Sequence, residues 1–373
     1  METYFLYFGL VVLSLLNSMV SKYVDLNLKR ILVFILLFLI ILIVGLRSVN
    51  VGSDTIEYFN SFNFIRYENV GSFRNLLNNN FFGSERLEPG FVYLNKFLNY
   101  ITPNPQILLF LESILLYGSI YLNISYLSLN PSLSAFFVLT GGIFITSMNL
   151  LRQYMALALC FLGYYFWTRS DKRKALFIII LATICFHRTA ILFLFLFLTD
   201  RIKFNKKSLV IGGIISLGSI LFFNPIIQIF YKVFPYYASY SNKLDDFGSG
   251  KTFVIFNILL CTLTLIVGLY CKKVGNFNSV FTFNRWNELS LFILISIVFT
   301  AFSWNFTQAD RISQYFRAFM VIYIPNCMYM IKNKKVIQNV LLISYIVVFV
   351  SYFTYMLVFK DNWNNVVPYL FCF

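Results

Sequence analysis

The sequence has little charge and almost no histidine. Charged side chains make up 12% of the 373 residues and there is one histidine, whereas hydrophobic residues make up 59%. Soluble domains carry about 25% charged residues, so this composition excludes an ordinary soluble enzyme. Apolar runs close to the roughly 20 residues that cross a bilayer recur along the chain. The composition therefore predicts an all-α membrane protein that spans the bilayer many times.

Paired cysteines and acidic metal-binding motifs are also missing. The six cysteines stand singly in or beside apolar runs, and no DxD motif occurs. Isolated cysteines in such positions behave as small apolar side chains. We therefore expect no disulfide framework, no metal site and no cofactor.

Acidic residues are half as frequent as basic ones, which gives a net charge of +15. In a membrane protein such an excess is typical of Lys and Arg retained on the cytoplasmic side, and we expect no nucleic-acid partner. Placing five basic segments in the cytoplasm puts 17 of the 30 basic residues inside, 12 of them lysines. These segments are 21–30, 169–174, 200–207, 271–288 and 332–335.

The apolar runs predict about ten to twelve transmembrane helices in one integral membrane domain, residues 1–373. The first run is interpreted as a retained helix rather than a signal peptide, because no basic segment precedes it. Both chain ends are then expected outside the cytoplasm. The runs are 4–20, 31–46, 107–129, 133–148, 150–168, 175–198, 208–223, 252–271, 289–304, 316–331 and 336–359.

Two segments depart from simple crossing helices. The run 175–198 lies between two basic segments, which predicts a re-entrant hairpin of two short helices with its tip near "CFHRTA". A single crossing helix is the alternative.

The segment 47–106 is too long for a tight connection and has aromatic anchors throughout, so we expect a large extracytoplasmic loop folded into short amphipathic helices.

Arg152 is the most unusual charge in the sequence, because it lies inside the apolar string "LLRQYMALAL". A cation at membrane depth costs about 2.5–3.5 kcal/mol on insertion scales and indicates function by default. Asn149, Gln153 and Ala156 are expected to form a polar stripe beside it on one helix. A structural arginine satisfied by a carboxylate, such as Asp310, is the alternative.

A second polar group lies in the string "ADRISQYFR". Asp310, Gln314 and Arg317 fall on one helical face, with Arg311 and Tyr315 alongside. The two arginines and the tyrosine suit an anionic lipid head group, since arginine grips phosphate bidentately. A water-exposed helix end is the alternative.

Three further candidates could move a proton or bind an acceptor. His187 precedes Arg188 at the expected hairpin tip. Asp54 follows Gly52 at a helix start and has Glu57 in capping-box spacing, which is its structural alternative. Glu88 precedes a proline that suits the first turn of a helix, but that proline does not account for the acid itself.

Five strings occur in the order "VGSDTIEYF", "EPGFVYLN", "LLRQYMALAL", "CFHRTAILF" and "RISQYF". As an ordered set they resemble the EpsG-like branch of the Wzy-type polysaccharide polymerases, over about residues 47 to 317. The resemblance implies a multi-pass protein of the bacterial inner (cytoplasmic) membrane, GT-C-like in fold, with its active site facing the periplasm or outside. It implies a metal-independent glycosyltransferase that polymerises polyprenyl-diphosphate-linked oligosaccharide repeat units of O antigen, capsule or exopolysaccharide. A chain-length regulator is an implied partner.

The resemblance also assigns roles to the candidates. The lipid diphosphate would be bound by Arg47, Arg152, Arg188 and Arg311. Gln153, Tyr315 and Arg317 are further candidates for substrate binding. The catalytic candidates, for the base or for acceptor binding, would be Asp54, Glu88 and His187. The alternatives are a polysaccharide or lipid-linked sugar transporter (flippase), a glycan ligase, and a membrane acyltransferase. A transporter should have basic residues through both leaflets, and an acyltransferase needs a histidine placed with a carboxylate.

Overall fold

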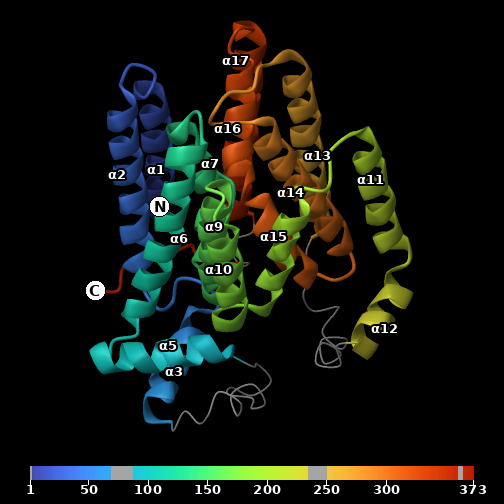
Figure 1. Cartoon of the computed structure of the whole chain (residues 1–373). Coiled ribbons are helices and arrows are strands. Elements are labelled where there is room, and N and C mark those ends of the chain that lie inside the picture. Colours follow the sequence, from blue (N-terminus) through green and yellow to red (C-terminus); the bar gives the residue numbers. More distant parts are fainter. Residues whose placement is uncertain (1, 69–86, 234–249, 360–363) are drawn as a thin grey trace. The chain divides into compact units, whose positions relative to one another are not determined.

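The computed structural model describes residues 2–68, 87–233, 250–359 and 364–373 (Figure 1). Within these ranges the chain forms helices and no sheet, with one isolated backbone bridge between Arg47 and Phe371. The all-α class is confirmed. The elements are α1 (Glu2–Val20), α2 (Leu26–Gly45), α3 (Thr55–Tyr67), α5 (Pro89–Ile101), α6 (Gln106–Leu127), α7 (Pro131–Thr140), α8 (Ile143–Ser147), α9 (Leu151–Thr168), α10 (Lys172–Cys185), the 3₁₀ helix η1 (Arg188–Leu198), α11 (Lys206–Leu221), α12 (Phe223–Val233), α13 (Lys251–Val274), α14 (Phe283–Phe302), α15 (Gln308–Arg317), α16 (Met320–Met330) and α17 (Lys335–Val358).

Among the described helices, six are long and apolar enough to cross a membrane, namely α1, α2, α6, α13, α14 and α17. A seventh is added if the pair α11 and α12, bent by 86°, counts as one broken span. These figures are lower than the ten to twelve expected because several apolar runs contain a break. The run 133–148 is divided at Gly141–Gly142, where Gly142 has a φ of +91°. The protein is a multi-pass membrane protein.

The break expected near "CFHRTA" lies where α10 ends at Cys185 and η1 begins at Arg188. Return of this segment to the same side of the membrane stays a prediction. The sharp bend between α11 and α12 lies instead in the run 208–223, for which the sequence predicted one continuous helix.

The chain forms two compact units, Met1–Ile191 with Val336–Phe373, and Leu192–Lys335. In the first unit α9 packs between α6 and α10, and α6 also packs against α2. Both α1 and α17 lie beside α7, where the rings of Phe137 and Phe349 are 4.7 Å apart. The 13-residue helix α5 lies crosswise at one end of these helices, and α3, also of 13 residues, packs against it (Figure 1). They come from the expected loop 47–106, of which residues 69–86 lie outside the described ranges.

In the second unit α14 packs against α11, α13 and α15, and α16 packs against α13 and α14. The contact between α13 and α16 is close at Gly268. The Trp286 Nε1–H donates to the Gly268 carbonyl at 3.2 Å, and the hydroxyls of Tyr323 and Ser290 are 2.9 Å apart. A Cβ added to Gly268 would overlap the Tyr323 hydroxyl. The glycine is therefore required for this packing.

Substitution of Gly268 by alanine should lower the thermal stability of the purified protein. Tyr323 is fully buried and hydrogen-bonded, so relief of the overlap has to move a ring or a helix, at a cost of about 1–3 kcal/mol. Gly213→Ala on α11 is the matched control, because its Cβ would meet open space. Thermal unfolding in one detergent compares the two variants. Equal melting temperatures would show that the α13–α16 contact adjusts without cost.

Candidate functional site

Glu88 and Arg152 form an ion pair between two elements of the first unit. Glu88 is the N-cap residue of α5 and makes no side-chain cap hydrogen bond there. Its carboxylate Oε2 instead accepts from the Arg152 Nη1, in the first turn of α9, at 2.7 Å. The two side chains are 6% and 14% exposed, so water screens this pair little. The arginine of the apolar string "LLRQYMALAL" therefore has a carboxylate partner, which is Glu88 rather than Asp310.

The second oxygen of the same carboxylate faces the break between α10 and η1. Glu88 Oε1 accepts from the backbone N–H of Arg188 at 3.4 Å. The start of α5 approaches the end of α10 so closely that a Cβ on Gly90 would overlap the Cys185 backbone. This approach positions Glu88 between the arginine of α9 and the amide of Arg188.

The α9 helix begins immediately before Arg152. Leu150 is its N-cap residue and provides no side-chain cap, and the neighbouring Gln153 is buried. A helix N-terminus carries roughly half a positive charge, which adds to that of the arginine. The Arg152 guanidinium also lies 6.0 Å from the centre of the Tyr58 ring of α3. The Glu88–Arg152 ion pair therefore lies at the N-terminal end of α9.

The expected polar stripe on this helix was wrong in one member. Asn149 precedes α9 and lies in the break after α8, because the chain does not become helical again until Leu151. Its side-chain Oδ1 accepts from the backbone N–H of Asp54 at 3.0 Å. Asn149 therefore ties the break to the turn that precedes α3.

That turn holds Asp54 through its backbone. Gly52 has a φ of +93°, and a Cβ there would overlap the Met148 carbonyl oxygen. The C-terminal segment supports the same turn, since the Gly52 N–H donates to the Asn365 carbonyl at 2.9 Å. Asp54 is the N-cap residue of α3, as predicted, but its side chain makes no cap hydrogen bond. The predicted capping box with Glu57 is therefore wrong.

His187 lies in the break after α10, directly before Arg188. Its Nδ1 is 2.6 Å from the Thr189 hydroxyl, a contact that fixes the orientation of the ring. The structure thus brings together, in the first unit, His187, Arg188, Glu88 and Arg152 through consecutive contacts, and Asp54 through Asn149.

Arg47 lies in a different set of contacts. It is fully buried, and its Nη1 donates to the Val44 carbonyl at 2.6 Å. Burial lowers the pKa of its guanidinium from the usual value, while the charge of Glu112 raises it. Full burial favours a structural role over contact with a lipid head group. Sequence reasoning missed Glu112, although one acid in the apolar run 107–129 was a usable signal.

Arg311, Tyr315 and Arg317 form a group within the second unit. Arg317 Nη1 donates to Asp310 Oδ1 at 3.0 Å, and Gln314 Nε2 donates to Asp310 Oδ2 at 3.0 Å. Pairing of Asp310 on its own helix agrees with the spacing in the sequence. Tyr315 is buried and Arg311 is half-buried.

Among the described residues, no group of three or more His, Cys, Asp or Glu side chains is placed to hold a metal ion. The first unit instead brings the Glu88 carboxylate, the Arg152 guanidinium and the N-terminus of α9 together, and the backbone N–H of Arg188, which follows His187, contacts the same carboxylate. Such a set can bind an anion and accept a proton.

A sequence model of one family, described as the EpsG family, matches residues 30–371 of the chain. No curated protein and no solved structure matches it.

Proposed function

The chain belongs to the EpsG family, which links it to exopolysaccharide synthesis, and on that premise we propose that it is a glycosyltransferase that joins lipid-linked oligosaccharide repeat units. The donor is a chain carried on a polyprenyl diphosphate, and the acceptor is the sugar of the next unit. The observation that carries the proposal is the buried Glu88–Arg152 pair, which also contacts the Arg188 amide.

The proposed reaction releases a diphosphate, and this leaving group requires positive charge at the site. When the bond between the sugar and the diphosphate breaks, the diphosphate departs as an anion, and cations stabilise it without a metal. Arg152 lies at the N-terminus of α9, and the backbone N–H of Arg188 contacts the same carboxylate as Arg152. In this proposal the Arg188 guanidinium supplies a second positive charge. Glu88 contacts both elements that carry these arginines, so its proposed part is to hold them in position.

The attacking group needs a base. The acceptor hydroxyl oxygen attacks the sugar carbon that carries the diphosphate, and its proton passes to a neighbouring group. His187 and Asp54 are the candidates, because Glu88 is engaged with Arg152 and the Arg188 amide. We propose His187 first, since Thr189 fixes its ring beside Arg188.

The same proposal includes the location of the enzyme, its independence of metal, its partner and its further substrate contacts. The enzyme would work in the bacterial cytoplasmic membrane with its site on the outer side, without a metal, and a chain-length regulator would act with it. Gln153 would contact the remainder of the substrate, and Arg47 would support the site from within. Arg311, Tyr315 and Arg317 belong to the second unit, and their part in substrate binding stays a prediction from the sequence.

A strain that lacks this chain tests the proposal through its surface glycan. A polymerase is expected to leave a single repeat unit in place of the normal chain-length ladder, and re-expression of the chain should restore the ladder. Complete loss of surface glycan would indicate a transporter. A full ladder retained on the lipid carrier would indicate a ligase.

A further inference from the structure

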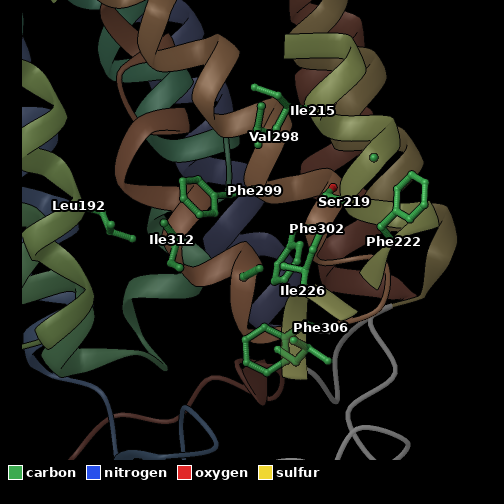
Figure 2. A pocket seen from close by; sticks show the side chains of 13 residues that line it. Leu192, Ile215, Ser219, Phe222, Ile226, Val298, Phe299, Phe302, Phe306 and Ile312 are labelled. Atoms are coloured by element: carbon green, nitrogen blue, oxygen red, sulfur yellow. The ribbon is translucent and has the colours of Figure 1, made fainter. Parts of the chain in front are cut away.

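A pocket of about 600 Å³ lies in the second unit, at the bend between α11 and α12 (Figure 2). Pockets that bind small molecules usually have volumes of about 300–1,000 Å³. The pocket lining includes Phe299, Phe302 and Ile312 from α14 and α15, and in Figure 2 these lie to one side of Ser219 and Phe222, which belong to or adjoin α11. The sharp bend turns α12 away from α11 and leaves this space between the helices.

The wall of the pocket is apolar. Ser219 is the one lining residue with a polar side chain, and its hydroxyl donates to the Ser216 carbonyl at 2.8 Å. A polar ligand group would lose its hydrogen bonds to water here and gain none in return. The part of a ligand that fills the pocket must therefore be hydrocarbon.

Several lining side chains are exposed, including Ile215 at 51% and Phe222 at 62%. They belong to or adjoin α11, which with α12 forms a candidate broken span, while α14 on the other side is a candidate span itself. Bilayer hydrocarbon covers such surfaces, and an open pocket at this depth admits one lipid chain.

A cation lies close to the pocket. Lys251, at the start of α13, has its ammonium 5.4 Å from the centre of the Trp304 ring, and Trp304 lies two residues from the lining residues Phe302 and Phe306. Trp and Lys together are typical of the boundary between hydrocarbon and head groups. The charge therefore complements an anionic head group.

We propose that this pocket binds one acyl chain of an anionic glycerophospholipid, whose phosphate lies near Lys251. The bound chain fills the angle between α11 and α12 and stabilises the bend. The proposal does not depend on the glycosyltransferase function, because it concerns a resident lipid rather than a substrate.

Native mass spectrometry of the full-length, delipidated protein tests this with two probes, palmitoyl-oleoyl phosphatidylglycerol and its phosphatidylcholine counterpart. Phosphatidylglycerol is expected to bind more tightly. Gly218→Phe should weaken its binding about tenfold, because the ring displaces a few methylene groups from the pocket. A Cβ on Gly218 meets no neighbour within 4 Å, and the melting temperature of the variant is measured to show that it stays folded.

Gly213→Phe is the matched control, since Gly213 lies on the same helix, also faces open space and does not line the pocket. It should bind phosphatidylglycerol as the unchanged protein does. Lys251→Gln should reduce the preference for phosphatidylglycerol over phosphatidylcholine. Equal binding by the Gly218→Phe and Gly213→Phe variants would overturn the proposal. Tight binding of polyprenyl monophosphate with no binding of phosphatidylglycerol would overturn it as well.

Discussion

Replacement of Glu88 and Arg152 together by glutamine should abolish long polymer while the protein stays at its normal level in the membrane. A single substitution would leave one buried charge unpaired, which lowers the free energy of unfolding by about 3–5 kcal/mol. Loss of polymer in such a variant could then result from unfolding rather than from a lost catalytic group. The double variant removes both charges and leaves amides that can still hydrogen-bond. A missing cation at the leaving group should slow transfer by about 10²–10³-fold.

The matched control is another ion pair of the first unit. Asp171 and Lys174 are 2.8 Å apart at the exposed start of α10, and Asp171→Asn with Lys174→Gln removes that pair in the same way. The glycan ladder and the amount of membrane protein are measured in both strains. A normal ladder from the Glu88→Gln/Arg152→Gln strain would show that the buried pair only supports the fold.

Gly90→Ala should shorten or abolish the polymer although Gly90 carries no functional group. Its Cβ would overlap the backbone of Cys185, so α5 has to move away from the end of α10. That movement separates Glu88 from the Arg188 amide, and a displacement of about 1 Å can cost about 10²-fold in rate. Ladder length is measured together with the melting temperature of the purified protein.

Gly118→Ala on α6 is the control for Gly90→Ala, because a Cβ on Gly118 meets nothing within 4 Å. It should leave ladder and stability unchanged. A Gly90→Ala protein with a normal ladder would mean that the distance between α5 and α10 does not matter for the reaction.

Local sequence signals predicted much of this protein. Hydrophobicity gave the all-helical membrane class, and Pro89 placed the start of α5. The spacing of Asp310, Gln314 and Arg317 foresaw their pairing on α15. Each of these signals acts within one or two helical turns, where sequence spacing determines distance.

The partner of Arg152 could not be predicted in the same way. Glu88 is 64 residues away, and its approach depends on the packing of α5 against α10. The sequence separates the runs 133–148 and 150–168, but Asn149 was assigned to the helix of Arg152 because its spacing from Gln153 is that of a helix. At the break after α8, Asn149 contacts the backbone of Asp54, and Met148 packs against Gly52. Both contacts join segments far apart in the sequence, so the local spacing of residues does not predict them.

The most direct measurement uses the purified protein in lipid nanodiscs with a synthetic polyprenyl-diphosphate-linked repeat unit. We expect products with two or more repeat units on one carrier, together with release of free polyprenyl diphosphate. The Glu88→Gln/Arg152→Gln protein should form neither product. Formation of the same products by that variant at the unchanged rate would contradict the proposed role of the pair. No product from the unchanged protein would contradict the proposed reaction itself.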